Sequence, residues 1–97
     1  MCKCFVLRSV STISNDQALA IRGRFGDKEA IETARNLLDN GNYVMLNARE
    51  VLATATDAEE VFDALNMSQD HYMTVGDVIV WNNGKRELCL GNGWATI

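Results

Sequence analysis

The chain contains 97 residues, of which 47% are hydrophobic and 23% charged, and its formal net charge is −4. This size and composition are typical of one folded unit with one core, so we predict a single domain over residues 1–97. Proline is absent, no apolar run approaches the roughly 18 residues needed to span a bilayer, and no signal-peptide pattern opens the chain. We therefore expect a cytoplasmic protein without membrane association.

The first predicted element is a strand near the N-terminus, in the stretch CKCFVLRSVSTI at residues 2–13. This stretch is rich in β-forming residues and is short enough for one strand. Alternation divides its apolar side chains between two faces, with Cys2, Cys4 and Val6 on one and Phe5 and Leu7 on the other. Because both faces are mostly apolar, we predict a central strand.

Two helices are predicted next. A short one over residues 16–21 can be capped by Asn15 and is interrupted by the glycines of RGRFGD. Asp27 can cap a longer helix, and Gly41 stands where a helix C-terminus favours a left-handed residue. One apolar stripe at helical spacing supports the longer helix: Ala30, Ile31, Ala34, Leu37 and Leu38.

The middle of the chain is ambiguous, because AREVLATA contains both β-branched residues and alanines. We predict a strand over residues 50–55. The sequence Thr56-Asp57-Ala58-Glu59 then fits a capping box, which predicts a helix that starts there and closes at Asn66. The apolar face of this helix comprises Ala58, Val61, Phe62 and Leu65.

The end of the chain predicts a β-meander. Strands are expected over residues 77–81 and 87–90, joined by a type I′ turn at Asn83-Gly84, and a second turn at residues 91–93 leads into residues 94–97. The predicted fold class is therefore α+β: a small antiparallel sheet of about four strands, with two main helices on one face. A terminal meander leaves an edge strand, which is a site where a homodimer could form.

The sequence gives little support for a metal site or for a catalytic site. The lone His71 could join the cysteines in a zinc site, but the spacing of Cys2 and Cys4 on one strand lacks a loop to wrap an ion. No nucleophile turn or phosphate-binding glycine loop is present, so we predict neither an enzyme nor a cofactor. A small metal-dependent or cysteine-dependent enzyme, in which His71 would act with Asp70 or Cys89, is kept as a third hypothesis. Otherwise three reduced thiols are expected, buried as small apolar groups.

The acidic residues are concentrated in one segment. Residues 57–77 hold six Asp or Glu and no Lys or Arg. Such a surface repels a phosphate backbone and favours a basic surface on another protein, although a solvated helix face is the simpler explanation of the same charges. The predicted protein-binding residues are five of these acids and one tryptophan: Asp57, Glu59, Glu60, Asp63, Asp70 and Trp81.

A basic loop offers a second kind of site. Arg22, Arg24 and Lys28 surround the glycines that separate the first two predicted helices, and Phe25 lies among them. This loop could hold a phosphorylated small ligand at the amide groups of the following helix, although Asp27 opposes an anion there. Direct nucleic-acid binding would need a longer basic stripe with interleaved aromatic residues, so the sequence argues against it.

The end of the chain also resembles a known group of proteins. MTVGDVIV at residues 73–80, NG at 83–84 and GWATI at 93–97 are similar to the ending of short proteins encoded by bacteriophages and other mobile elements. In that group the ending reads Ser-(Met/Thr)-Ser-Val-Gly-Asp-Val-Ile, then a β-turn, an aromatic-containing strand and Gly-(Phe/Trp)-x-x-(Ile/Leu). VLATATDAEEVF at residues 51–62 resembles the preceding strand and helix, so the likeness covers residues 51–97.

The resemblance implies an accessory protein of mostly unknown function, of a kind that often binds and inhibits host machinery. His71-Tyr72 stands where the group commonly has Arg-Ser, and Cys89 lies in the second terminal strand. The leading hypothesis is therefore a non-catalytic phage-type protein that binds a host protein for host takeover or counter-defence. The alternative from another class is a small-molecule binder that sequesters a nucleotide signal through the basic loop.

Overall fold

The computed structural model describes residues 4–45, 56–66 and 73–97. Within these ranges the chain forms five strands and three helices, and the α+β fold class is confirmed. The elements run in chain order as β1 (Cys4–Ser9), α1 (Asn15–Ile21), α2 (Asp27–Asp39), β2 (Tyr43–Met45), α4 (Ala58–Asn66), β3 (Val78–Trp81), β4 (Arg86–Leu90) and β5 (Gly93–Thr96). The predicted strand over residues 50–55, Cys2, Asp70 and His71 lie outside the described residues.

The described strands form one antiparallel sheet in the order β2-β1-β3-β4-β5. β1 lies between β2 and β3, as its two apolar faces predict, and the last three strands form the predicted terminal meander. β2 was not predicted, because three residues after a glycine turn give too short a pattern to recognise. β5 lies at one edge of the sheet, and pairing of two copies along this edge stays a prediction.

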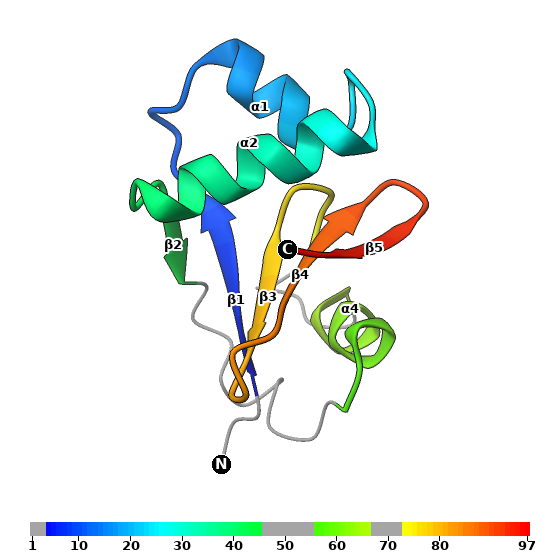
Figure 1. The fold of residues 1–97 in the computed structure, drawn as a ribbon. Coiled ribbons are helices and arrows are strands. Elements are labelled where there is room, and N and C mark those ends of the chain that lie inside the picture. The colour runs from blue at the N-terminus through cyan, green and yellow to red at the C-terminus, as the bar shows by residue number, and fades with distance from the viewer. Residues whose placement is uncertain (1–3, 46–55, 67–72) are drawn as a thin grey trace.

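The helices cover both faces of the sheet, and the prediction that they share one face is wrong. Figure 1 shows α1 and α2 together on one side, and α4 apart from them. The reason lies in the strands: Val78 faces the α2 side while its neighbour Ile79 faces the α4 side, and both are fully buried. A strand with apolar residues at successive positions needs a covering layer on each face.

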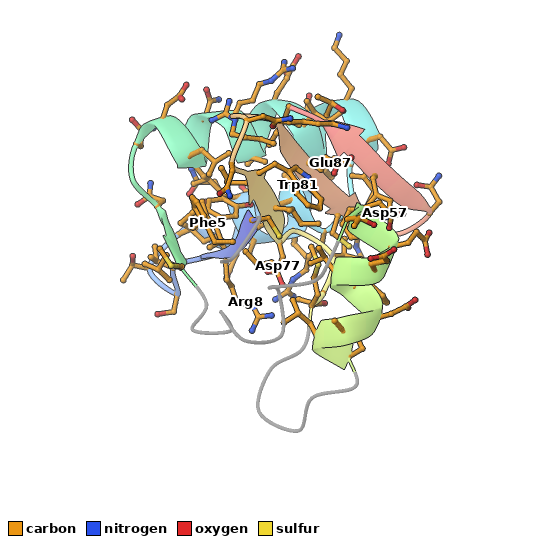
Figure 2. All side chains as sticks on the ribbon, turned by 90° about the horizontal axis from the view of Figure 1, so that it is seen from below. Phe5, Arg8, Asp57, Asp77, Trp81 and Glu87 are labelled. Atoms are coloured by element: carbon orange, nitrogen blue, oxygen red, sulfur yellow. The ribbon has the colours of Figure 1, made fainter. Side chains whose placement is uncertain are left out.

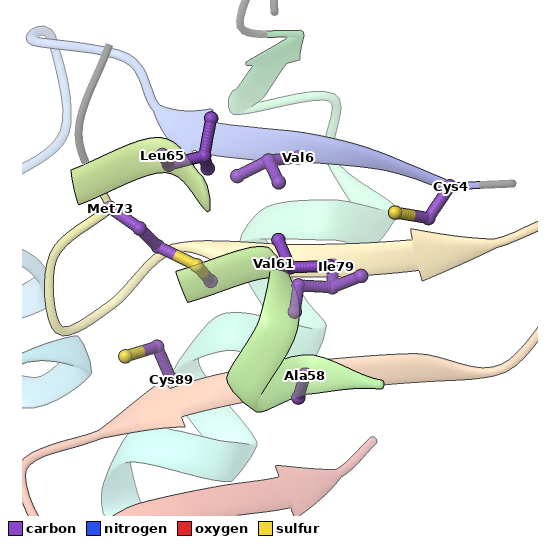
Figure 3. Close-up of a cluster of buried hydrophobic side chains, with 8 residues drawn as sticks. All are labelled: Cys4, Val6, Ala58, Val61, Leu65, Met73, Ile79 and Cys89. Carbon is purple, nitrogen blue, oxygen red and sulfur yellow. The ribbon is translucent and has the colours of Figure 1, made fainter. Parts of the chain in front are cut away.

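Each face has its own cluster of buried side chains. On the α2 side, Ala30, Ala34 and Leu37 of α2 pack with Val78 and Leu88 of the sheet. On the α4 side, the cluster shown in Figure 3 joins α4 to the strands and contains Cys4, Val6, Ala58, Val61, Leu65, Met73, Ile79 and Cys89. The apolar stripes read from the sequence are therefore the packing faces of both helices.

The helix caps differ from the prediction by one residue each. α1 is capped by Ser14, whose hydroxyl accepts from the Gln17 backbone while the Gln17 side chain accepts from the Ser14 backbone, so Asn15 is the first helical residue. Gly26, with a φ of 98°, holds the cap position of α2 in place of Asp27. The predicted left-handed residue after α2 is present, since Gly41 has a φ of 73°.

The turn between β3 and β4 is also not the one predicted. A type I′ turn needs positive φ at two residues, but only Gly84 has one here, at 92°, and no non-glycine residue with positive φ occurs among the described residues. The Trp81 carbonyl accepts from Gly84, and the Trp81 N–H donates to the Lys85 carbonyl. The hairpin therefore has a three-residue loop, Asn82 to Gly84, which ends on a left-handed glycine.

Candidate protein-binding site

The four acidic residues predicted on α4 and its cap are all exposed, but they have different roles. The Glu60 backbone N–H donates to Asp57 Oδ1 at 2.9 Å, and the Glu60 carboxylate accepts from the Thr56 backbone and hydroxyl. Asp57 and Glu60 therefore cap the helix, one position later than the predicted box. Glu59 and Asp63 take part in no such contact among the described residues, and they are the carboxylates available to a partner.

A hollow of about 400 Å³ lies beside the N-terminus of α4 and brings two predicted residues together. Asp57 and Trp81 both line it, although 24 positions separate them in the chain. The remaining lining residues come from the segment that precedes α4 and from the β3-β4 hairpin: Thr56, Ala58, Asn82, Asn83, Lys85 and Glu87. Figure 2 shows Asp57, Trp81 and Glu87 in the same part of the molecule.

Glu87 fixes the tryptophan in this hollow. The Trp81 indole Nε1 donates to Glu87 Oε2 at 2.7 Å, and Lys85 Nζ lies 3.5 Å from Glu87 Oε1. The Trp81 ring also packs against the buried cluster on the α4 face. Neither Glu87 nor Lys85 was predicted as a site residue from the sequence. The signal that could have found them is the hairpin register, which places alternate residues of neighbouring strands on the same face.

A smaller hollow of about 180 Å³ lies on the other flank of α4. It is lined by Glu59 and Phe62 of α4 and by Cys89, Leu90, Gly91, Gly93 and Trp94 around the β4-β5 turn. Phe62 and Trp94 meet edge to face, with ring centroids 6.1 Å apart and an interplanar angle of 78°. The acidic helix thus has a partly buried tryptophan on each side.

The Val75-Gly76-Asp77 motif has a structural explanation. Gly76 has a φ of 99°, and a Cβ there would approach Ile21 to 3.3 Å, so the position requires glycine. Asp77 is 2% exposed and accepts from Arg8 Nε at 3.1 Å and Nη2 at 2.8 Å, and from the Thr74 backbone at 3.0 Å. This motif therefore packs against Ile21 of α1 through Gly76 and binds Arg8 of β1 through Asp77. The pairing of Arg8 with Asp77 was not predicted, because 69 positions separate the two residues.

The three cations of the predicted anion site are exposed but do not converge in one hollow. Arg22 lines a hollow of about 290 Å³ together with Arg8 and Asp77, between β1, α1 and the turn before β3. Arg24 and Lys28 are not among its lining residues. Arg22 thus shares a hollow with Arg8, which is distant in sequence.

The described thiols are buried. Cys4 and Cys89 are 1% and 3% exposed, and neither is in a disulfide. Burial, and secondarily the charge of Asp77, raise the pKa of Cys89 to about 11, and the same two causes raise the pKa of Tyr43 well above its usual value. A thiol that is protonated at neutral pH is a poor nucleophile. Within residues 4–45, 56–66 and 73–97, no group of three or more His, Cys, Asp or Glu gathers as a metal site would require.

Comparison with known proteins assigns no family: no family model, curated protein or solved structure matches the chain. None of the helices in the described part of the chain is long and apolar enough to cross a membrane.

Proposed function

We propose that this chain is a non-catalytic accessory protein of the phage type, which binds a basic surface of a host protein in the host cytoplasm and thereby modulates or inhibits it. The contact surface is the outer face of α4 with the Trp81 hollow beside it. Asp57, Glu59, Glu60, Asp63 and Trp81 belong to this surface, and Asp70 lies outside the described residues.

One observation carries the proposal: Asp57 and Trp81 line the same hollow at the end of an exposed acidic helix. Complementary charge accelerates encounter and selects a partner, while half-buried tryptophans are among the side chains that most often dominate binding energy. The surface around α4 offers both features next to each other. The resemblance of residues 51–97 to phage-encoded proteins points to a host protein as the partner.

The test uses tagged protein to capture partners from a bacterial lysate, followed by an affinity measurement with the captured protein. Glu59 and Asp63 are reversed together to Lys, because neither caps the helix. We expect the affinity to fall about tenfold or more, which corresponds to about 1.4 kcal/mol, and the binding of the unaltered chain to weaken as salt rises.

A matched control reverses two carboxylates on the opposite side of the sheet. Glu29 and Glu32 are exposed on α2, and Glu29 lies in the first turn of its helix, as Glu59 does in α4. Their reversal changes the net charge by the same amount, but it leaves the α4 surface intact. Equal affinities of the two double variants would contradict the proposed contact surface.

A second function, the sequestration of a small nucleotide, is favoured by one observation, the presence of Arg8 and Arg22 in one hollow. A thermal-shift screen with nucleotides and cyclic dinucleotides tests it. A ligand at about 100 times its Kd stabilises the folded state by about 2.7 kcal/mol, and Arg22→Gln should reduce that gain. A screen without any shift rejects this function.

A further inference from the structure

The Trp81 hollow contains an aromatic ring that is fixed before any partner arrives. The indole N–H is bonded to Glu87 at 2.7 Å, and the Trp81 backbone N–H donates to the Lys85 carbonyl at 2.8 Å. The Glu87 side chain is only 14% exposed, so its position is set by the sheet. Because the indole nitrogen is already bonded to Glu87, the part of Trp81 that lines the hollow offers aromatic surface rather than a free N–H donor.

Asp57 contributes a free acceptor to the same hollow. Its Oδ1 accepts from the Glu60 backbone, whereas no described residue bonds to its other oxygen. Among the described lining residues the hollow has two carboxylates, Asp57 and Glu87, and one cation, Lys85. The balance is therefore negative, which disfavours an anion. The exposed charges of Asp57 and Lys85 make the burial of a purely apolar side chain costly.

We propose that this hollow receives an arginine side chain of the partner, with the guanidinium stacked on Trp81 and bonded to Asp57. This inference rests on the proposed function and names the chemistry of its partner. A guanidinium is planar and weakly hydrated, stacks on an indole, and matches a carboxylate with two parallel donors. A lysine ammonium is more strongly hydrated and offers no flat face, so it satisfies only the charge.

Lys85 brings a positive charge to the same hollow and pairs with Glu87. Its Nζ lies 3.5 Å from Glu87 Oε1, and its side chain is half exposed, so the contact is easily broken. An incoming arginine that bonds to Asp57 would be repelled by the like charge of Lys85 in the same hollow. Removal of the Lys85 charge should therefore tighten arginine binding, an effect opposite to that expected if Lys85 were part of the contact surface.

The experiment titrates the full chain with short acetylated and amidated peptides that carry one central residue in a Gly-Ser context. The central residue is Arg, Lys or citrulline, the last being a neutral analogue of nearly the same shape as Arg. The readout is the indole N–H signal of Trp81 in a nitrogen-proton correlation spectrum, which Trp81→Phe assigns because the chain has two tryptophans. We expect the Arg peptide to shift this signal and to saturate at about 1–10 mM, and the citrulline peptide to leave it unchanged.

Two conservative variants test the roles of the charges. Asp57→Asn keeps an oxygen that can cap the helix but removes the carboxylate, and it should weaken binding of the Arg peptide about threefold or more. Lys85→Gln should tighten it about two- to fivefold. An unshifted Trp81 signal, an equal response to citrulline, or unchanged affinity in both variants would overturn the inference.

The two experiments distinguish failure of the arginine inference from failure of the proposed function. If reversal of Glu59 and Asp63 abolishes capture of the host protein but no peptide moves the Trp81 signal, the arginine inference fails and the proposed function stands. If the Arg peptide binds as expected but the reversal leaves capture unchanged, the proposed function fails, and the hollow keeps its assignment as an arginine site.

Discussion

The two faces of the sheet differ in what surrounds their apolar centres. On the α2 side, Ala30, Ala34 and Leu37 pack on the strands, and the polar contacts at the border run to backbone carbonyls, from the Tyr43 hydroxyl to Gly76 and from Arg86 Nη2 to Ile97. On the α4 side, the centre is equally apolar, but charged groups line its borders. These are the Arg8–Asp77 pair, the Trp81–Glu87 bond and the exposed carboxylates of α4.

This difference is the structural basis of the proposed division between stability on one face and partner binding on the other. The α2 face is covered by α1 and α2, and the hollow that contains Arg22 lies at its border. The α4 face adds to its packing two hollows, each lined by a tryptophan and by an acidic residue of α4 or its cap. Substitutions on the two faces should therefore have similar effects where they reach the core, and different effects at the borders.

The largest expected effect comes from the charged border of the α4 face. Arg8→Met leaves Asp77, whose side chain is 3% exposed, without its cation, and loss of one member of a buried pair costs about 3–5 kcal/mol. Urea denaturation should show this fall in the free energy of unfolding. The double variant Arg8→Met/Asp77→Asn should recover much of the loss, because no charge is then left buried. A loss below about 1 kcal/mol in the single variant would contradict the structural role of the pair.

The next largest loss of stability tests whether the helices on both faces pack on the sheet as buried core. Leu37 of α2 and Leu65 of α4 are each fully buried, so Leu37→Ala and Leu65→Ala should each destabilise the fold by about 2–5 kcal/mol. Thermal or urea unfolding measures both. Leu19→Ala, at a side chain 36% exposed, is the control and should change stability by less than about 0.5 kcal/mol. A small effect at Leu65 alone would mean that α4 does not cover the sheet as described.

An intermediate loss of folding stability should appear at high pH. The pKa of Cys89 is raised from 9.0 to about 11, so the folded state keeps this thiol neutral while the unfolded state ionises it. Stability that is present below pH 9 should thus be lost as the pH rises toward 11, by on the order of 2 kcal/mol. Denaturation curves of the native chain and of Cys89→Ala at pH 8 to 11 measure this loss as the difference in slope between the two proteins. Parallel curves would show that the buried thiol is not linked to folding.

The smallest expected effect concerns the helix caps. Asp57→Ala removes the acceptor that Glu60 uses at the start of α4, and it should cost about 1 kcal/mol. Ser14→Ala at the start of α1 is the matched change on the other face, and it should cost a similar amount. Asp57→Asn should be nearly neutral for stability because it keeps a capping oxygen. A loss as large in Asp57→Asn as in Asp57→Ala would show that charge, rather than the cap, holds this terminus.

Much of the fold followed from local patterns. The stripe from Ala30 to Leu38 predicted α2, the alternation around Val6 predicted a central strand, and Asn83-Gly84 predicted the hairpin. The observed helix N-caps lie one residue away from the predicted ones. Neighbouring residues can each take the cap position, and only the path of the backbone selects one. The turn type was wrong for a related reason: Asn83 tolerates either sign of φ, and the strand register decided the loop length.

By itself the sequence determined the class of the fold, the packing faces of the helices and the exposure of the acidic residues on α4, because these depend on periodicity and on side-chain hydration. Only the tertiary structure decided that the helices lie on opposite faces of the sheet, that Asp77 pairs with Arg8, and that Asp57 and Trp81 share one hollow. Each of these features joins residues far apart in the chain. Their contact depends on strand order and register, which the local pattern of any one segment does not specify.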